Sequence, residues 1–384
     1  MVSINRKKVV IAPDSFKESM TALEVAKAIE AGFKKVLPDW EYIKIPMADG
    51  GEGTVQSLVD ATDGSIKQIE VLDPLGRKIK ATYGISGDGK KAIIEMAAAS
   101  GLELLKESER DAMNTTSWGL GNLVRAALDE EVDHILVGIG GSATNDAGAG
   151  MVQSLGGKLL DEDGEQIPYG GVSLDKLTTI DLSALDTRLK RTKIEVACDV
   201  NNPLTGLNGA SYVYGPQKGA DEEEVKELDQ NLKHFSEVIH QGLGTNIENE
   251  PGAGAAGGVG GAMLAFLGAE LRKGGELIVE MLGLEETIKT ADLVITGEGE
   301  INHQTIFGKT PIVVAKIAEK YGIPVIALVG SISEGYKEVY ENGIDAVFSI
   351  LPEVTDLEEA LNNAYRNVEQ TARDVAAVLA LSKI

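Results

Sequence analysis

The stretch KKVVIAPDS, residues 7–15, is a short apolar run that ends at a proline and two polar residues. Such a run, rich in β-branched residues, is typical of a strand buried on both faces of a parallel sheet. Thr21 then begins a helical pattern that continues to residue 37. A second strand (41–47) and a second helix (54–64) follow, so the chain opens as βαβα, which is typical of an open α/β sheet.

The pattern changes after residue 64. Alternating apolar and polar residues between 65 and 96, separated by turn residues, predict a β-meander. The β/α alternation returns near the end of the chain, where three strands are expected at residues 291–296, 323–330 and 345–350. A chain of 384 residues usually forms more than one core. We therefore predict an α/β fold of two domains, a discontinuous Rossmann-like domain (1–75 and 285–384) and an inserted mixed α/β domain (76–284).

Composition excludes several classes of function. The net charge is −24, and such a surface repels nucleic acid and anionic membranes. The single cysteine, Cys198, rules out an internal disulfide and is typical of a reducing compartment. No segment has the length of a membrane span. We expect a cytoplasmic protein with no nucleic-acid or membrane partner, in which a few lysines would have to hold any anionic ligand.

Gly308-Lys309-Thr310 opens a helical pattern after a strand, as in a phosphate-binding P-loop. That motif requires glycine five residues before the Gly-Lys pair, because backbone N–H groups must curl around a phosphate. His303 occupies this position, so the stretch is not a P-loop. Lys309 can still reach a phosphate as a point charge near a helix start.

A second glycine-rich turn, VGIGGSATNDAGAG (137–150), follows the apolar run HILV. We expect a helix to begin near Ala143, where free N–H groups would meet phosphate oxygens. Ser142, Asn145 and Asp146 crowd polar groups into the turn. The turn also matches a loose dinucleotide fingerprint, although no acidic strand end stands at the required offset.

Carboxylates follow the first two predicted strands. Asp14, Ser15 and Lys17 lie at a strand's carboxyl end, where open α/β sheets bind ligands. Asp49 and Glu52 end the second strand and form a pair suited to magnesium, which takes one or two protein carboxylates beside phosphate. Ordinary helix capping explains both groups equally well.

A third polar loop, ACDVNNPLTG (197–206), places Asp199 and Asn202 after an apolar strand. Asp199 is a candidate general base, and an Asx-turn is the alternative. Lys218 lies in a later loop, YGPQKGA. Each loop by itself is weak evidence, but together they suggest one site that binds an anion and a metal.

Seven motifs occur in a specific order along the chain: IAPDSFKESMTALEVAKAIEAGF, MADGGEGTVQSLV, GIGGSATNDAGAGM, ACDVNNPLTGLNGAS, YGPQKGA, PGAGAAGGVGGAMLAFLGAEL and TGEG followed by GKTP. In this order they resemble the bacterial glycerate kinases, the family that includes the glycerate 2-kinases. The resemblance covers essentially the whole chain. It implies transfer of the ATP γ-phosphoryl group to D-glycerate with Mg²⁺, giving a phosphoglycerate, with 2-phosphoglycerate favoured. It also implies two α/β domains with the active site in the cleft between them.

With this resemblance, the polar loop residues receive hypothetical roles. Asp199 would accept the glycerate hydroxyl proton, and Lys17 would assist catalysis by offsetting charge. The cofactor-binding residues would be Gly140, Gly141, Ser142, Asn145, Lys218 and Lys309. The glycerate-binding residues would be Ser15, Asn202, Gln304 and Thr305. The magnesium ligands would come from Asp49, Glu52, Asp146 and Glu298.

The chain departs from the family pattern at a few positions. Glu300 stands where the pattern usually has Arg, Asn302 where it has Asp, and Asn122 where it has Glu. Two alternatives therefore stay open: an NAD(P)-dependent oxidoreductase that uses the GIGGSA turn, and a non-catalytic sensor of glycerate or nucleotide. A homodimer is compatible with every one of these functions.

Overall fold

The structure, a computed structural model, describes residues 6–48 and 53–381. The chain divides into two compact units, and each is described by itself below. The first unit comprises Met1–Asp49, Gln56–Thr62 and Gly275–Ile384, and the second comprises Gly50–Val55 and Asp63–Gly274. Across the described ranges, no helix combines the length and apolar character that a membrane crossing requires.

The first unit is built on a parallel sheet of five strands in the order β13-β12-β11-β1-β2. Strand β1 pairs with β11, so the first strand of the chain lies beside one almost 300 residues later. The strands are β1 (Lys8–Ile11), β2 (Glu41–Lys44), β11 (Leu293–Ile301), β12 (Val325–Ile332) and β13 (Ala346–Ser349).

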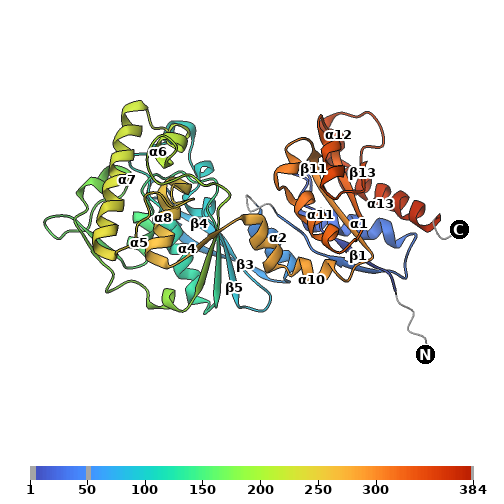
Figure 1. Ribbon diagram of the computed structural model, residues 1–384, viewed down its shortest axis with the longest axis horizontal. Coiled ribbons are helices and arrows are strands. Elements are labelled where there is room, and N and C mark those ends of the chain that lie inside the picture. The colour runs from blue at the N-terminus through green and yellow to red at the C-terminus, as the bar shows by residue number, and fades with distance from the viewer. Residues whose placement is uncertain (1–5, 49–52, 382–384) are drawn as a thin grey trace. The chain divides into compact units, whose positions relative to one another are not determined.

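Helices cover both faces of this sheet. Val9 and Ile11 of β1 belong to one apolar cluster with helices α1 and α13, which lie side by side (Figure 1). Val10, between them, points to the other face and is fully buried as well. The helices mostly or wholly in this unit are α1 (Ala22–Lys34), α2 (Thr54–Ala61), α9 (Gly274–Met281), α10 (Leu284–Ile288), α11 (Thr310–Lys320), α12 (Leu357–Asn362) and α13 (Ala364–Leu381).

The second unit contains a mixed sheet of six strands in the order β10-β9-β6-β5-β4-β3. The meander β3-β4-β5 is antiparallel, whereas β5, β6, β9 and β10 run parallel. The strands are β3 (Ser65–Leu72), β4 (Lys78–Ile85), β5 (Lys91–Glu95), β6 (His134–Gly138), β9 (Lys193–Ala197) and β10 (Glu270–Arg272), with a separate hairpin of β7 (Lys158–Leu160) and β8 (Thr179–Asp181).

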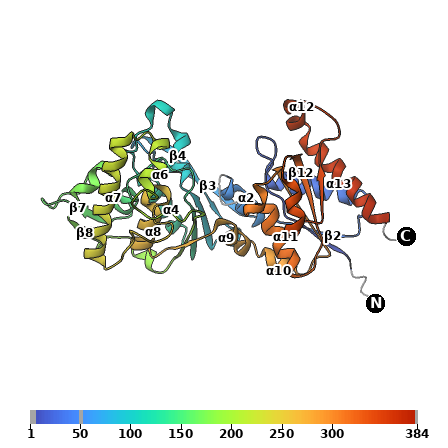
Figure 2. The same cartoon turned by 45° about the horizontal axis from the view of Figure 1, so that its top comes forward.

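Helix α7 (Glu222–Leu243) shows how sequence defines a helix in this unit. Asp221 caps its first turn in a capping box, and Gly244 ends it in the left-handed conformation. Its buried residues recur at helical spacing, so one face enters the core while the other stays polar. The helix runs beside β8 (Figure 2). The remaining α-helices are α3 (Ala97–Ser100), α4 (Trp118–Asp129), α5 (Ala149–Ser154), α6 (Ala210–Tyr214) and α8 (Val259–Leu267).

The predicted α/β fold class is confirmed, whereas three details of the prediction differ from the structure. The boundary expected near residue 75 lies at 62–63, because β3 pairs with β4 in the second unit's sheet. At the other end, the second unit finishes at Gly274 rather than at residue 284. The helix expected near Ala143 begins only at Ala149. The intervening residues include Ala147 and Gly148 with positive φ, which prevents an earlier helix start.

Candidate functional site

The carboxyl ends of parallel strands are where open α/β sheets bind ligands. In the first unit, Asp14 and Ser15 follow β1 at this edge. The Asp14 backbone N–H donates to Gly297 O of β11 at 2.8 Å, which continues the pairing of the two strands beyond the ladder. Thr310 Oγ1 at the start of α11 donates to Asp14 Oδ2 at 2.8 Å. Three separate segments therefore fix one carboxylate.

Glu298 of β11 is the second carboxylate at this edge. It is 7% exposed, accepts a hydrogen bond from Thr305 Oγ1 at 2.7 Å, and pairs with Lys309 Nζ at 3.2 Å. Burial raises the pKa of Glu298, the nearby Asp14 raises it further, and the bonds from Thr305 and Lys309 oppose the rise. The predicted residues Glu298, Thr305 and Lys309 thus form one cluster, with Ser15 beside Asp14.

The loop that follows β11 is an Asx-turn around Asn302. Its Oδ1 accepts from Gln304 N at 2.9 Å, and its N–H donates to Thr305 Oγ1 at 3.1 Å. An aspartate oxygen could accept the same bond, so the amide preserves the backbone that places Thr305. Glu300 accepts a hydrogen bond from Ser333 Oγ and is exposed.

Other predicted residues of this unit are less constrained. The side chains of Lys17 and Gln304 are exposed, so both are accessible to a ligand. Asp49 and Glu52, the expected magnesium pair, lie outside the described residues. Within the described ranges there is no group of three or more His, Cys, Asp or Glu residues arranged to hold a metal ion. Two carboxylates, Asp14 and Glu298, nevertheless suit Mg²⁺, which completes its shell with water and phosphate.

In the second unit, the glycine-rich turn follows β6 at the carboxyl edge. Gly140 and Gly141 are exposed, and Gly141 has φ +69°, which favours glycine. A Cβ at Gly140 would meet no atom within 4 Å, so the space in front of the turn is open. The backbone of the turn is tied to the α3 region, where Ala143 N donates to Ser100 O at 2.9 Å. A ligand can approach this backbone closely.

Lys218 lies behind the same turn, at the end of a 3₁₀ turn (Pro216–Lys218). Its side chain is buried, and Nζ donates to Ser142 Oγ at 2.9 Å and to Thr144 O at 2.7 Å. Burial lowers the pKa of Lys218 to about 7, and the charge of Asp146 opposes this shift. The lysine is therefore part of the framework of the turn, whereas the sequence suggested a ligand-facing charge.

Asp146 is fully buried and its carboxylate is occupied. It accepts hydrogen bonds from Ser117 N and Oγ, both at 2.8 Å, and from the N–H groups of Gly148 and Gly150. Burial raises the pKa of Asp146, and these donors oppose the rise. Such a fully buried carboxylate, held by four donors, organises the turn, which argues against the magnesium role that the sequence suggested for it.

Asn145 is also buried, and its Nδ2 donates to Ser211 Oγ at 3.0 Å. Its Oδ1, Thr144 Oγ1 and Ser100 Oγ have no hydrogen-bond partner among the described residues. Buried polar atoms are normally paired, so three unpaired ones around one turn mark a specialised region.

Asp199 follows β9 at the same edge of the sheet. Its side chain is exposed and accepts from Gly274 N at 3.0 Å, which leaves its second oxygen accessible. Asn202 uses both ends within its own loop: Nδ2 donates to Asn208 O, and Oδ1 accepts from Tyr214 Oη, both at 2.8 Å. Asp199 is thus placed to meet a ligand, whereas Asn202 supports the loop.

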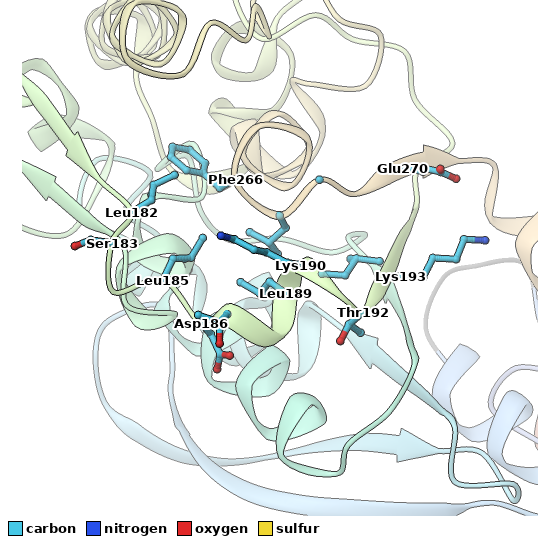
Figure 3. A pocket seen from close by; sticks show the side chains of 14 residues that line it. Leu182, Ser183, Leu185, Asp186, Leu189, Lys190, Thr192, Lys193, Phe266 and Glu270 are labelled. Atoms are coloured by element: carbon cyan, nitrogen blue, oxygen red, sulfur yellow. The ribbon is translucent and has the colours of Figure 1, made fainter.

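A pocket of about 640 Å³ in the second unit lies at the opposite edge of the sheet, at the amino ends of β9 and β10 (Figure 3). Apolar side chains such as Leu189 and Phe266 line it together with Lys190 and Lys193. None of the predicted site residues is in this lining. Chemistry and topology, rather than cavity size, therefore locate the candidate site.

Comparison with known proteins decides the family. The family model of the glycerate kinases, described as "Glycerate kinase family", matches residues 9–380. The chain belongs to the glycerate kinase family. It is 54% identical to a glycerate 2-kinase of Escherichia coli strain K12 over 97% of this chain and 98% of that protein. It is also 54% identical to a glycerate kinase of Bacillus subtilis strain 168, over 98% of each chain.

A solved structure from Salmonella typhimurium LT2, described as "putative glycerate kinase 2", superposes with a TM-score of 0.91. The two chains are 53% identical, and the match covers 98% of this chain and 99% of the other. Family membership makes the protein a glycerate kinase, an enzyme of the transferase class. The oxidoreductase alternative is wrong, and the glycine-rich turn agrees, because no helix follows it at the position that a dinucleotide fold requires.

Asp14 and Thr310 are absent from the set of site residues expected from the sequence, although Asp14 lies in a loop at the predicted ligand-binding edge. The Asp14 carboxylate becomes part of a candidate site because it lies near Glu298, which is almost 300 residues away in the chain. The only available signal was the polar loop after the first strand, which could not show that β1 would pair with β11.

The buried Lys218 gives a pH-dependent stability. Between pH 7 and 10.5 the unfolded chain keeps the lysine proton while the folded chain loses it, so stability rises with pH in this window. We expect the wild-type unfolding free energy, measured against Lys218→Met by denaturant titration, to rise by about 2 kcal/mol from pH 7 to pH 9. The exposed Lys226→Met serves as the control and should show no such change. A difference that is constant with pH contradicts a depressed lysine pKa.

Because Asn302 forms an Asx-turn, we expect Asn302→Asp to have only a small effect on turnover. Aspartate can accept the same bond from Gln304 N, so we expect turnover to stay within about one order of magnitude, well below the usual effect of losing an acid–base group. Asn302→Ala removes the accepting oxygen and should lower turnover more. Steady-state kinetics of the two variants tests this. Equal losses of turnover in both variants would show that Asn302 does not act by holding the Asx-turn.

Proposed function

We propose that this enzyme transfers the γ-phosphoryl group of ATP to the 2-hydroxyl of D-glycerate, with Mg²⁺, and works in the cytoplasm. The observation that carries the proposal is the family match over residues 9–380. The 54% identity to a protein named glycerate 2-kinase supports the 2-hydroxyl as acceptor. The single cysteine supports a reducing compartment.

Phosphoryl transfer requires positioning and charge neutralisation more than covalent chemistry. In the second unit, Gly140 and Gly141 present exposed backbone to the phosphates, and Ser142 adds a hydroxyl. The fixed backbone of the turn means that little ordering is needed when the anion binds. Asn145 and Lys218 hold this turn from behind and do not face the ligand.

In the first unit, Asp14 and Glu298 are the proposed magnesium ligands. There Mg²⁺ would supply positive charge that neutralises the phosphates. Lys309 neutralises Glu298 in this structure, at 3.2 Å. If Glu298 held a cation, the Lys309 ammonium would be available to a phosphate oxygen. Lys17 is exposed beside this loop and offsets further negative charge.

Asp199 is the proposed acceptor of the glycerate hydroxyl proton. It is an exposed carboxylate at the carboxyl edge, held on one side by Gly274 N. Ser15, Thr305 and Gln304 are the polar groups proposed to bind glycerate. Asn202 is left out of this set, because both ends of its amide are used within its own loop.

The deciding experiment is ADP release from ATP with D-glycerate. A kinase releases ADP only when glycerate and Mg²⁺ are both present, and EDTA abolishes the reaction. A sensor would bind the two ligands with no turnover, and that result would overturn the proposal. The product is assigned by ³¹P NMR, because a 2-phosphate couples to one proton and a 3-phosphate couples to two.

Asp199→Asn tests the proton acceptor. An amide cannot take a proton, so we expect turnover to fall by ~10²–10⁴-fold with little change in nucleotide affinity. Asp175→Asn, at another exposed aspartate of the same unit, is the matched control and should leave turnover unchanged. A loss below about tenfold would assign the base to another group.

A further inference from the structure

The structure places a lysine where it cannot touch a ligand. Lys218 is 1% exposed, whereas Gly140 and Gly141, the glycines of the turn in front of it, are exposed. Its two hydrogen bonds go to Ser142 Oγ and Thr144 O, which both belong to the turn. Burying a lysine is costly, so a lysine kept here with two hydrogen bonds indicates a functional role. Because both bonds go to the turn, Lys218 can influence a ligand only through the turn.

Ser142 is the residue through which Lys218 can influence a bound ligand. A serine hydroxyl has a single hydrogen to donate and accepts with its lone pairs. Because Lys218 Nζ donates to Oγ at 2.9 Å, the hydroxyl hydrogen is directed away from the lysine. Within residues 6–48 and 53–381, the structure gives this hydrogen no acceptor. Ser142 is 8% exposed, next to the open space in front of Gly140.

We propose that Lys218 is a positioning residue that orients the Ser142 hydroxyl as a hydrogen-bond donor toward a phosphate oxygen bound at the Gly140–Ser142 turn. The proposal rests on the proposed function, which puts the nucleotide phosphates at this turn. It changes the role of Lys218 from a direct counter-charge to a group that sets the hydrogen-bond polarity of another side chain. Without this donor, the hydroxyl hydrogen of Ser142 would be free to rotate.

The charged groups around Lys218 are consistent with this task. Asp146 is the nearby carboxylate, and four donors already occupy its oxygens. Arg110 packs against the loop that carries Lys218, and its Nη1 donates to Gln217 O at 3.3 Å. Arg110 is itself a cation, and Asp146 makes no salt bridge with the lysine, so the protonation of Lys218 responds to an added negative charge. A bound phosphate favours the ammonium form, which can only donate, and this secures the orientation of Ser142.

A double-mutant cycle on ADP binding tests the coupling. Calorimetric titration with ADP and excess Mg²⁺ compares the wild type with Ser142→Ala, Lys218→Met and the double variant. Losing one charge-assisted hydrogen bond should weaken binding by about tenfold or more in each single variant. Because the lysine acts through the serine, the double variant should bind no more weakly than the weaker single variant. Lys226→Met, on the exposed face of α7, is the control.

The outcomes separate the two proposals. Additive losses, or a Lys218→Met variant that is folded and binds ADP normally, overturn the positioning role. Unchanged ADP affinity in Ser142→Ala overturns the assignment of this turn to the phosphates, and thus part of the proposed function itself. Thermal melting of each variant shows which of them are folded before binding is compared.

A second measurement needs no folded lysine variant. If ADP binding favours the ammonium form, the wild type takes up protons from the buffer at pH 8. Titrations in buffers of different ionisation enthalpy give the number of protons. We expect net uptake by the wild type and, where the variant folds, none by Lys218→Met. Absence of uptake in the wild type overturns the proposed locking of Ser142 by a protonated lysine.

Discussion

The parallel pairing of β1 with β11 is the constraint on which the rest of the first unit depends. Val9, Val10 and Ile11 align with Leu293, Val294 and Ile295. The bonds continue past the strand, from Ala12 N to Ile295 O and from Asp14 N to Gly297 O, both at 2.8 Å. Asp14 is therefore held beside Glu298 by backbone geometry. The two carboxylates repel one another, but they stay close together because the pairing of β1 with β11 fixes the backbone that carries them.

The second unit reaches the same kind of precision with buried polar groups. Asp146 gathers the N–H groups of Ser117, Gly148 and Gly150, and Lys218 joins Ser142 to Thr144. Burying these charges is costly, and their hydrogen bonds offset the cost only in one conformation of the turn. The glycines in front stay accessible. The buried side chains thus hold the backbone of the turn rigid, and its exposed glycine side remains accessible to an anion.

The distribution of charge limits where this protein can bind the phosphates of a nucleotide. A protein with a net charge of −24 binds a polyanion only where a few cations or backbone N–H groups are concentrated. Lys309 is paired with Glu298, and Lys218 is buried, so neither acts as a free surface charge. Exposed backbone at Gly140 and Gly141 and a divalent cation at the carboxylates would then supply most of the attraction.

The sequence by itself determined the local elements. Apolar runs such as VVI (9–11) predicted the strands, Thr21 marked the start of the first helix, and the missing glycine at His303 excluded a P-loop. The ordered motifs also identified the family. These signals are local, since each depends on residues within one or two turns of each other.

Only the tertiary structure decided which polar residues work together. Asp146 and Lys218 have the residue types expected of ligand-binding groups, but both are buried and support the turn. Asp14 gains its partner from a strand almost 300 residues later, and the meander strand β3 joins the second unit through its pairing with β4. Burial and strand order depend on contacts between distant parts of the chain. No local pattern encodes them, because the same residues could face ligand or core until the sheets have formed.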